Sequence, residues 1–234
     1  QHLGENMEIK NAKNLTAADV KLSAAVYGKS GTGKTTFGAS FPKPFFLDID
    51  GGLLSVRGQD VSYIDLTPGK GVTWPNILDA LAEGKKGDYE SIIVDSLTGL
   101  ADLCMESVLQ LNRRAGQKPN FDDWAAYANK TKDFIVRLLA TGKNVLLICH
   151  EAPDKDELTG HVWMLPAIQG QMKSRIANYF DEFYHAEVEQ TPGKPSNYRL
   201  LARPSSIYTA KSRLESSYLV PSFQSLMNLQ RNIK

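Results

Sequence analysis

Cysteine is scarce in this sequence, because the 234 residues include only Cys104 and Cys149. Neither has the spacing of a metal ligand or a cysteine partner close by, so a disulfide framework and a cysteine zinc site are not expected. We expect both to be buried thiols in a reducing cytosol. No apolar run approaches the roughly 18 residues of a membrane-spanning helix, and the N-terminus lacks the apolar core of a signal peptide. These absences predict a soluble intracellular protein with no membrane partner.

The sequence also lacks an excess of charge of either sign. Its 27 basic residues balance 26 acidic ones and leave a formal net charge of +1. A nucleic-acid site would therefore have to be a local basic patch rather than a field over the whole surface. Internal repeats and low-complexity segments are lacking too. A chain of this length can form one substantial domain with its own core, and we expect one.

One motif dominates what is present. Residues 28–35 read Gly-Lys-Ser-Gly-Thr-Gly-Lys-Thr and match the G-x-x-x-x-G-K-[ST] pattern of a phosphate-binding loop in full. The apolar residues 22–27 predict a buried strand before it, and residues 35–40 predict the first turns of a helix after it. A glycine-rich turn with a chance lysine is the alternative. The strand before the loop and the helix after it favour the phosphate-binding interpretation.

The chemistry of this loop follows from its residue types. Glycines allow consecutive backbone N–H groups to turn inward around a phosphate, at the positive end of the following helix. Lys34 is expected to reach the β- and γ-phosphates, and the Thr35 hydroxyl is expected to ligate Mg²⁺. The sequence therefore predicts ATP or ADP with Mg²⁺, bound through Gly28, Lys29, Ser30, Gly31, Thr32, Gly33, Lys34, Thr35 and Thr36.

Polar residues stand at the ends of three further apolar segments that predict strands. Because the carboxyl ends of parallel strands share one edge of an open sheet, where ligands bind, we expect these side chains near the phosphate loop. Asp95 is expected to hold Mg²⁺, usually through water. The three strand ends are Asp48 and Asp50 at the end of the segment 45–50, Asp95 and Ser96 at the end of 89–96, and His150 at the end of 144–150.

The remaining patterns predict a mostly parallel sheet flanked by helices and extended by antiparallel strands. The segment 151–170 is expected to be a functional or disordered loop because of its length. Apolar spacing and turn residues predict helices over 74–83, 97–111, 122–140 and 221–230, a basic loop over 112–120, a strand over 61–66, and antiparallel strands over 180–188, 198–202 and 207–211.

The phosphate loop, the acids after the second strand, the Asp95-Ser96 strand end and the strand ending in His150 follow one another in the order of RecA-like ATPases, which the chain resembles. More narrowly, it resembles the small phage ATPases of the AAA_24 type, which include single-strand annealing recombinases built from the RecA core alone. The resemblance implies an α/β RecA-like P-loop core over 21–213, with an N-terminal arm over 1–20 and a C-terminal tail or helix over 214–234. It also implies the cytoplasm of a bacterial host cell.

The resemblance assigns catalytic roles to single residues. RecA-like proteins carry a catalytic carboxylate, normally glutamate, just after the strand that follows the phosphate-loop helix, and Asp50 occupies that place. Aspartate is shorter by one methylene, and this departure bears on the rate of hydrolysis. Asp48 is the second candidate, and a solvated strand end or a role in the Mg²⁺ shell is the alternative for either. His150 takes the position of the polar γ-phosphate sensor, with a strand-end histidine bonded to backbone as the alternative.

Two further elements of the resemblance concern a neighbouring subunit and DNA. Lys211 and Arg213 resemble the K-x-R element with which one subunit reaches into the ATP site of the next, although such a tripeptide also occurs by chance. The two DNA loops would map onto residues 112–121 and 151–170. Ordinary surface cations and core aromatics are the alternative for their candidate contacts to single-stranded DNA, which are Arg113, Arg114, Lys118, and Trp163 or Phe121.

These patterns leave competing functions. The leading hypothesis is a DNA-stimulated, Mg²⁺-dependent ATPase that assembles into a ring or filament on single-stranded DNA, with ATP between subunits. It would promote annealing or strand exchange in phage recombination, working beside a single-strand DNA-binding protein. The alternative is a nucleotide-gated loader or interaction protein with weak ATPase activity. A small-molecule kinase would use the same loop, but the Asp95-Ser96 strand end fits it less well and no arginine-rich lid is evident.

Overall fold

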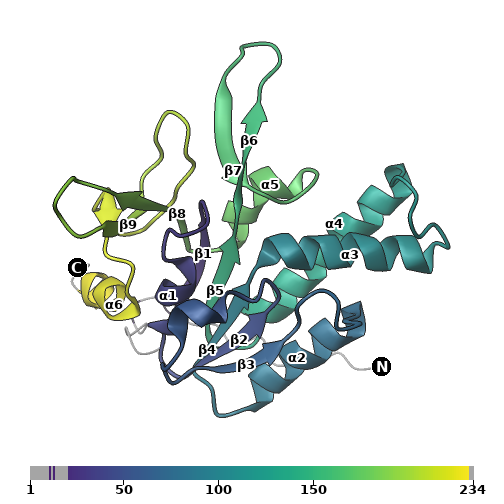
Figure 1. Cartoon of the computed structure of the whole chain (residues 1–234), viewed down its shortest axis with the longest axis horizontal. Coiled ribbons are helices and arrows are strands. Elements are labelled where there is room, and N and C mark those ends of the chain that lie inside the picture. Colours follow the sequence, from purple (N-terminus) through teal and green to yellow (C-terminus); the bar gives the residue numbers. More distant parts are fainter. Residues whose placement is uncertain (1–10, 12, 14–20, 232–234) are drawn as a thin grey trace.

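The computed structural model describes residues 11, 13 and 21–231, and a central sheet of eight strands runs through it (Figure 1). The strand order is β10-β9-β8-β1-β5-β4-β2-β3. Apart from residues 11 and 13, the predicted arm over 1–20 lies outside the described residues. The strands of the sheet are β1 (Ser23–Tyr27), β2 (Pro44–Asp48), β3 (Ser62–Asp65), β4 (Ser91–Asp95), β5 (Asn144–Cys149), β8 (Glu182–Glu189), β9 (Asn197–Leu201) and β10 (Tyr218–Leu219).

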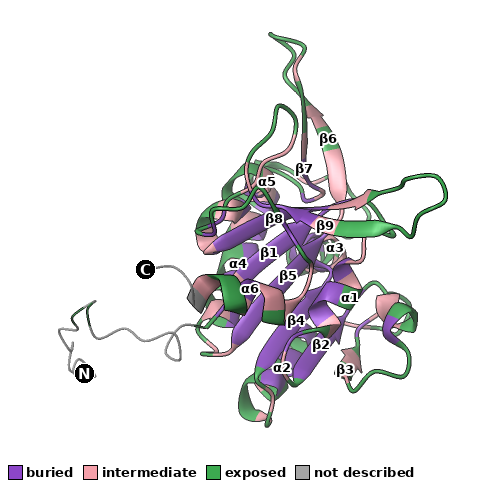
Figure 2. Ribbon diagram, turned by 90° about the vertical axis from the view of Figure 1, so that its left-hand side faces the viewer, coloured by how far each residue is buried: buried purple, intermediate pink, exposed green. Residues whose placement is uncertain are grey.

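Helices cover both faces of the sheet. Along β1, Ala25 and Tyr27 join the core cluster that α2, α3 and α4 cover, whereas Ala24 and Val26 join the cluster that α1 and α6 cover. Figure 2 shows the central strands of the sheet as buried. Strands buried on both faces form continuous apolar runs, which explains why the sequence predicts them well. None of the described helices is both long and apolar enough to cross a bilayer. The helices are α1 (Lys34–Ala39), α2 (Trp74–Lys86), α3 (Leu97–Leu111), α4 (Phe121–Leu139), α5 (Met172–Arg175) and α6 (Phe223–Arg231), with the 3₁₀ helices η2 (Gly52–Val56) and η3 (Ile176–Tyr179).

The sheet is parallel through most of its width. β1 pairs in parallel with β5 on one side and with β8 on the other. Parallel pairing continues through β4, β2 and β3, whereas β9 and β10 are antiparallel to their neighbours. The predicted α/β class, a mostly parallel sheet extended by antiparallel strands, is confirmed. The prediction that residues 180–188 extend the core as an antiparallel strand is wrong for β8, because the crossover through α5 and η3 returns the chain parallel to β1.

The prediction of a strand over 207–211 is wrong. In the described chain this stretch makes only isolated bridges, between Phe183 and Lys211 and between Met164 and Tyr208. From His185 onward β9 occupies the edge of β8, so only the first residues of β8 can accept another partner. The strand that does extend β9 is the two-residue β10, which is not among the strands predicted from the sequence.

The segment 151–170 contains regular structure, which corrects the prediction of a functional or disordered loop. β6 (Glu151–Lys155) and β7 (Val162–Pro166) form an antiparallel hairpin that projects from the sheet (Figure 1). Its turn is closed locally, because Asp156 Oδ1 accepts the backbone N–H groups of Leu158 at 2.8 Å and Thr159 at 3.3 Å. We call residues 151–166 the β6–β7 hairpin.

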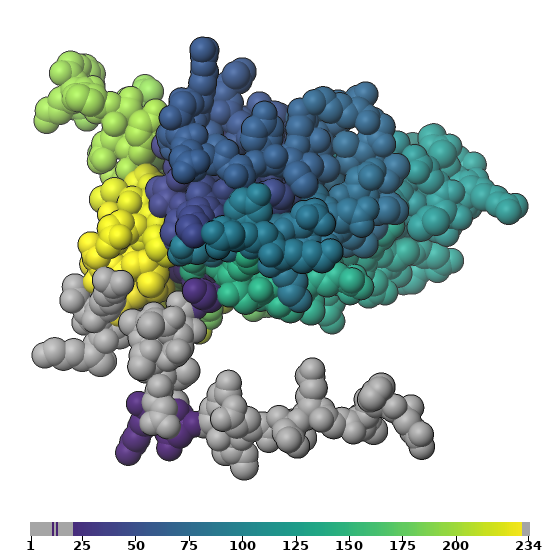
Figure 3. Space-filling model, turned by 90° about the horizontal axis from the view of Figure 1, so that it is seen from below, coloured from purple at the N-terminus to yellow at the C-terminus, as the bar shows by residue number. Residues whose placement is uncertain are grey.

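The C-terminal segment packs on the same core as the rest of the chain (Figure 3). Phe223 in α6 lies 4.9 Å from Phe41 between ring centroids, and its backbone N–H donates to Ser40 Oγ at 2.9 Å. Leu226 is fully buried in the core cluster beside α1. The described residues beyond 213 therefore cover one face of the sheet next to the phosphate loop's helix.

Candidate functional site

The phosphate loop joins β1 to α1 and lies at the carboxyl edge of the parallel strands. Lys34 is only 7% exposed, and its ammonium donates to the backbone carbonyls of Gly28 at 2.8 Å and Lys29 at 2.7 Å. Burial lowers the pKa of Lys34, although nearby acids oppose the shift. The loop borders a cavity of about 1020 Å³, which we call the nucleotide cavity. Residues 30, 31 and 33–36 of the predicted set line it.

Thr35 and Asp95 meet at the floor of this cavity. The Thr35 hydroxyl donates to Asp95 Oδ2 at 2.7 Å, which joins the first turn of α1 to the end of β4. Burial raises the pKa of Asp95 to about 6. The hydrogen bond from Thr35 acts to lower this pKa, whereas the negative charges of Asp50 and Asp48 raise it further. A buried carboxylate among other carboxylates is a favourable place for a divalent cation, and hydroxyl and carboxylate oxygens are ligands that Mg²⁺ accepts.

The chain alone does not supply a full metal shell in its described part. No group of three or more histidine, cysteine, aspartate or glutamate side chains is arranged to hold an ion among the described residues. Mg²⁺ at Thr35 and Asp95 would therefore need phosphate oxygens and water as its other ligands. Mg²⁺ bound together with a nucleotide commonly has such a shell.

Asp50 and His150 form a hydrogen-bonded pair in the same cavity. Asp50 Oδ2 lies 2.7 Å from His150 Nε2, and the two side chains are 24% and 39% exposed. Burial of Asp50 acts to raise its pKa, but hydrogen bonds from His150 and Ser96 and the charge of Lys34 outweigh it, so the pKa is lowered. Asp50 is therefore held as a carboxylate facing the cavity.

A glycine at the start of α3 makes room for this carboxylate. A Cβ atom at Gly99 would lie 2.8 Å from Asp50 Oδ1 and equally close to Ile49 Cγ2. Real Cβ atoms do not approach so closely, so a larger residue at this position would displace Asp50. The neighbouring Thr98 hydroxyl accepts the backbone N–H of His150 at 3.0 Å.

The geometry distinguishes the two carboxylates at the end of β2. Asp48 is 4% exposed, and its Oδ1 accepts the backbone N–H groups of Gly51 at 2.9 Å and Gly52 at 3.2 Å. Burial raises the pKa of Asp48, although these two hydrogen bonds act to lower it. Asp48 thus holds the turn after β2, whereas Asp50 lines the nucleotide cavity.

Lys211 and Arg213 lie away from their own nucleotide cavity. The Arg213 guanidinium contacts Asp181, which also accepts the Ser23 hydroxyl at 2.8 Å at the start of β1. The phosphate loop follows the opposite end of β1. Lys211 Nζ donates to the carbonyl of Ala177 at 2.9 Å. Neither cation contacts the phosphate loop of its own chain.

The candidate DNA contacts fall into two separate groups. Arg113 and Lys118 are exposed in the turn between α3 and α4, whereas Trp163 is 38% exposed on the β6–β7 hairpin beside His161. Figure 1 shows the α3–α4 turn and the hairpin projecting from different sides of the domain. The structure does not bring the two groups together.

Arg114 has partners within the chain. Its Nε lies 3.3 Å from the buried Asp123 carboxylate, and its Nη2 donates to the carbonyl of Lys118 at 2.8 Å. Asp123 also accepts the backbone N–H of Asn120 at 2.8 Å and so begins α4. Arg114 therefore belongs to the support of this turn rather than to its free surface.

Several residues of the site escape the sequence analysis. Thr98, Gly99 and Asp102 line the nucleotide cavity and follow the Asp95-Ser96 strand end so closely that their place in the chain is a usable signal. Tyr198 lines the cavity from β9, and no motif marks it. Glu151 and His185 form a buried pair on the far side of the phosphate loop, and no spacing connects them in the sequence.

A prophage-derived bacterial protein is similar to part of this chain. The SPbeta prophage-derived uncharacterized protein YorG of Bacillus subtilis strain 168 is 28% identical over 139 residues, which are 56% of this chain and 41% of the relative. The chain thus spans less than half the length of that relative.

Two solved structures are similar over most of the chain. The KaiC-like protein PH0186 of Pyrococcus horikoshii OT3 is 15% identical with a TM-score of 0.45 and covers 78% of each chain. The flagellar accessory protein FlaH of Methanocaldococcus jannaschii is 13% identical with a TM-score of 0.37, covering 84% of this chain and 82% of that one. A family model matches much more directly: the AAA domain of the AAA_24 type covers residues 20–214, so this protein belongs to that family of AAA domains.

Proposed function

We propose that this protein is a Mg²⁺-dependent ATPase that assembles on single-stranded DNA and promotes annealing or strand exchange in phage recombination. The observation that carries the ATPase proposal is the convergence of Lys34, the Thr35–Asp95 pair and the Asp50–His150 pair on one cavity. These groups come from the ends of different parallel strands, where such folds bind ligands. The prophage origin of the relative supports the phage context.

In this proposal the loop amides and Lys34 hold the β- and γ-phosphates, and Thr35 with Asp95 holds the metal. Mg²⁺, when bound, neutralises charge on the phosphate oxygens. Asp50 orients a water molecule and accepts one of its protons as the water oxygen bonds to the γ-phosphorus and the bond to the ADP oxygen breaks; the proton then passes from Asp50 to solvent. The electron pair of that bond leaves with ADP. His150 turns from Asp50 to a γ-phosphate oxygen, which frees Asp50 to accept hydrogen bonds from the water.

The proposed assembly brings a second subunit to this site. Lys211 and Arg213 lie far from their own phosphate loop, so they can act on nucleotide only in a neighbouring copy. A cation supplied from a neighbour stabilises charge on the transferring phosphoryl group and couples hydrolysis to assembly. Hydrolysis by an isolated subunit should therefore be slow.

Single-stranded DNA is the proposed stimulus. Arg113 and Lys118 supply exposed cations for phosphates, and Trp163 supplies an aromatic face for a base. Nucleotide binding would favour the DNA-bound assembly through a difference in affinity between two states, and hydrolysis would release it. A single-strand DNA-binding protein is the proposed partner at the same DNA.

The test is ATP hydrolysis by the purified protein with Mg²⁺, with and without single-stranded DNA, over a range of protein concentrations. We expect DNA to stimulate turnover, with a steep dependence on protein concentration. The Lys34→Ala variant is the control and should lose nucleotide binding or turnover. Retained hydrolysis in that variant would remove the assignment of the phosphate loop.

A nucleotide-gated loader or interaction protein is the second candidate. Two observations favour it: the acid at the catalytic position is an aspartate, and its Oδ2 is held by His150. This candidate predicts nucleotide binding with little turnover and no response to DNA. The same hydrolysis assay, combined with a nucleotide-binding titration, separates the two functions.

A further inference from the structure

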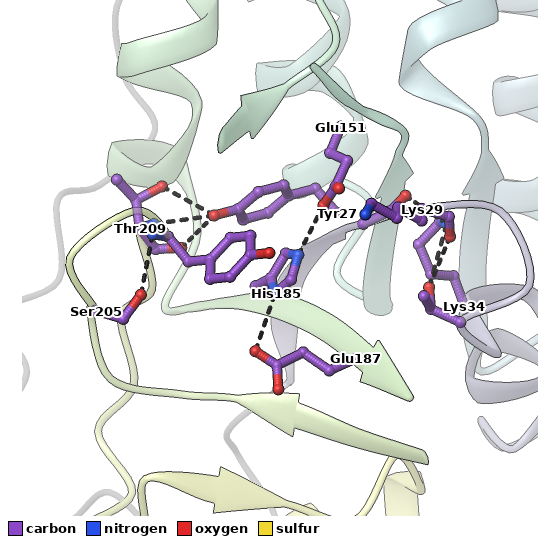
Figure 4. Close-up of polar contacts among 11 residues, drawn as sticks. Tyr27, Lys29, Lys34, Glu151, His185, Glu187, Ser205 and Thr209 are labelled. Atoms are coloured by element: carbon purple, nitrogen blue, oxygen red, sulfur yellow. Dashed lines mark hydrogen bonds and ion pairs between the residues drawn. The ribbon is translucent and has the colours of Figure 1, made fainter. Parts of the chain in front are cut away.

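Glu151 and His185 form a buried hydrogen-bonded pair beside the phosphate loop (Figure 4). Glu151 Oε2 lies 2.7 Å from His185 Nε2, and the two side chains are only 4% and 5% exposed. The second carboxylate oxygen, Glu151 Oε1, is buried and has no hydrogen-bond partner among the described residues. Burial of a carboxyl oxygen without a hydrogen-bond partner is unfavourable, which makes this pair a candidate for a role beyond packing.

The pair is fixed in place from several sides. The His185 ring stacks on Tyr208 with centroids 3.7 Å apart, and its Nδ1 lies 3.4 Å from Glu187 Oε1. Glu187 in turn accepts the guanidinium of Arg199 at 3.2 Å. These contacts hold the imidazole on β8 and leave Glu151 as its partner from the other strand.

Glu151 directly follows His150, and the two side chains serve opposite cavities. In an extended chain, consecutive side chains point to opposite sides. His150 reaches Asp50 in the nucleotide cavity, whereas Glu151 lines a second cavity of about 610 Å³ with Lys29 and Thr32 of the phosphate loop. Holding Glu151 therefore fixes the backbone from which the His150 side chain leaves the strand end.

β8 also lies directly against the phosphate loop. A Cβ atom at Gly28 would stand 2.7 Å from the carbonyl oxygen of Ala186, the residue after His185. Only glycine allows this approach. The Glu151–His185 pair thus connects the end of β5 to the strand that supports the start of the loop.

We propose that Glu151 and His185 are a positioning pair that fixes the backbone at His150, from which its side chain turns from Asp50 to the γ-phosphate, so that discrimination between ATP and ADP depends on this buried contact. The proposal rests on the proposed nucleotide site. Because Glu151 is also the first residue of the β6–β7 hairpin, a turn of His150 from Asp50 to a γ-phosphate would be transmitted to the base of that hairpin. Neither Glu151 nor His185 touches the nucleotide in this proposal.

The experiment compares the affinities of the full chain for ADP and for AMP-PNP, both with Mg²⁺, by calorimetric titration. The wild type should bind AMP-PNP more tightly than ADP. Glu151→Gln keeps the shape and replaces the carboxyl group by an amide, and it should reduce this preference about fivefold or more while leaving ADP affinity within about twofold. The matched control is Glu157→Gln, an exposed glutamate in the turn of the same hairpin, which should leave both affinities unchanged.

A double-mutant cycle tests whether Glu151 acts through His150. His150→Ala should remove the preference, and Glu151→Gln should then add nothing in that background. The positioning pair is overturned if Glu151→Gln prefers AMP-PNP over ADP as strongly as Glu157→Gln does. It is also overturned if Glu151→Gln causes a further loss of preference in the His150→Ala background. If Glu151→Gln gives no cooperative thermal unfolding, His185→Gln takes its place with the same expected result.

The failure of the proposed function has a different signature. A wild type that binds neither nucleotide overturns the nucleotide site and the positioning pair with it. A wild type that binds both nucleotides equally overturns the sensing role and leaves the phosphate loop assigned. Loss of ADP and AMP-PNP affinity in equal proportion in Glu151→Gln shows a structural role only and overturns the proposal.

Discussion

Asp50 Oδ2 and His150 Nε2 lie 2.7 Å apart, although a hundred residues separate them in the sequence. The loop after β2 brings one of them to the nucleotide cavity, and the end of β5 brings the other, with β4 between the two strands. The contact lowers the pKa of Asp50 against the effect of its burial, so the carboxylate is ionised and partnered at once. An acid in this state can serve as a base only after its partner turns away.

Asp50→Asn is expected to lower kcat for ATP by about 100-fold or more and to leave nucleotide affinity nearly unchanged, because the group acts on water rather than on phosphate. Asp48→Ala is the matched comparison. It should keep kcat but lower the free energy of unfolding by about 1 to 3 kcal/mol, since the N–H groups of Gly51 and Gly52 lose their acceptor. Steady-state kinetics and urea unfolding measure both. The reverse pattern would make Asp48 the catalytic acid.

Asp95→Asn is expected to abolish Mg²⁺-dependent hydrolysis and to stabilise the metal-free protein. Burial raises the pKa of Asp95 from 3.8 to about 6. Between these values the folded state keeps a proton that the unfolded state releases, so wild-type stability falls as pH rises through this window. The shift corresponds to at most about 3 kcal/mol.

Urea unfolding in EDTA measures the effect of Asp95→Asn. The stability gain of the variant over the wild type should be small near pH 4 and largest above about pH 6. A gain that is the same at both ends of the range would contradict a buried carboxylate as its cause.

Arg213→Ala and Lys211→Ala are expected to impair turnover at high protein concentration while leaving nucleotide affinity of the isolated subunit intact. Asp181→Asn is the control, because it removes the intramolecular partner of Arg213 and keeps both cations. Mixing Arg213→Ala with Lys34→Ala subunits should restore part of the activity, since some interfaces then combine an intact loop with an intact cation. Equal losses in Arg213→Ala and Asp181→Asn, without restoration on mixing, would exclude a role in a neighbouring subunit.

Arg113→Ala with Lys118→Ala is expected to weaken binding to single-stranded DNA and to flatten its salt dependence, because fewer counterions are released. Arg114→Ala should act differently. Its guanidinium partners the buried Asp123, so the loss should appear as a lower thermal midpoint with a nearly unchanged salt slope. Fluorescence anisotropy at several salt concentrations checks the first effect. An unchanged slope in the Arg113 and Lys118 variant would exclude the α3–α4 turn as a DNA contact.

The sequence predicts the parts of this fold that depend on local pattern. β1, β4 and β5 are continuous apolar runs because parallel strands are buried on both faces, and α3 spans the predicted residues 97–111 because its apolar face repeats at helical spacing. The phosphate loop is predictable for the same reason, since its function needs particular residues at adjacent positions. The hairpin over 151–166 and the two-residue β10 escape prediction because short pairings carry little periodicity.

The sequence by itself determined the phosphate loop, the parallel strands and the acids and histidine at their ends, because each of these features depends on residues that are adjacent in the chain. Only the tertiary structure decided which of these side chains meet. It paired Asp50 rather than Asp48 with His150, bound Arg114 to Asp123, and placed Glu151 against His185. Contacts of this kind depend on strand order and on the direction in which each side chain leaves its strand, and both arise from packing across the sheet rather than from local spacing.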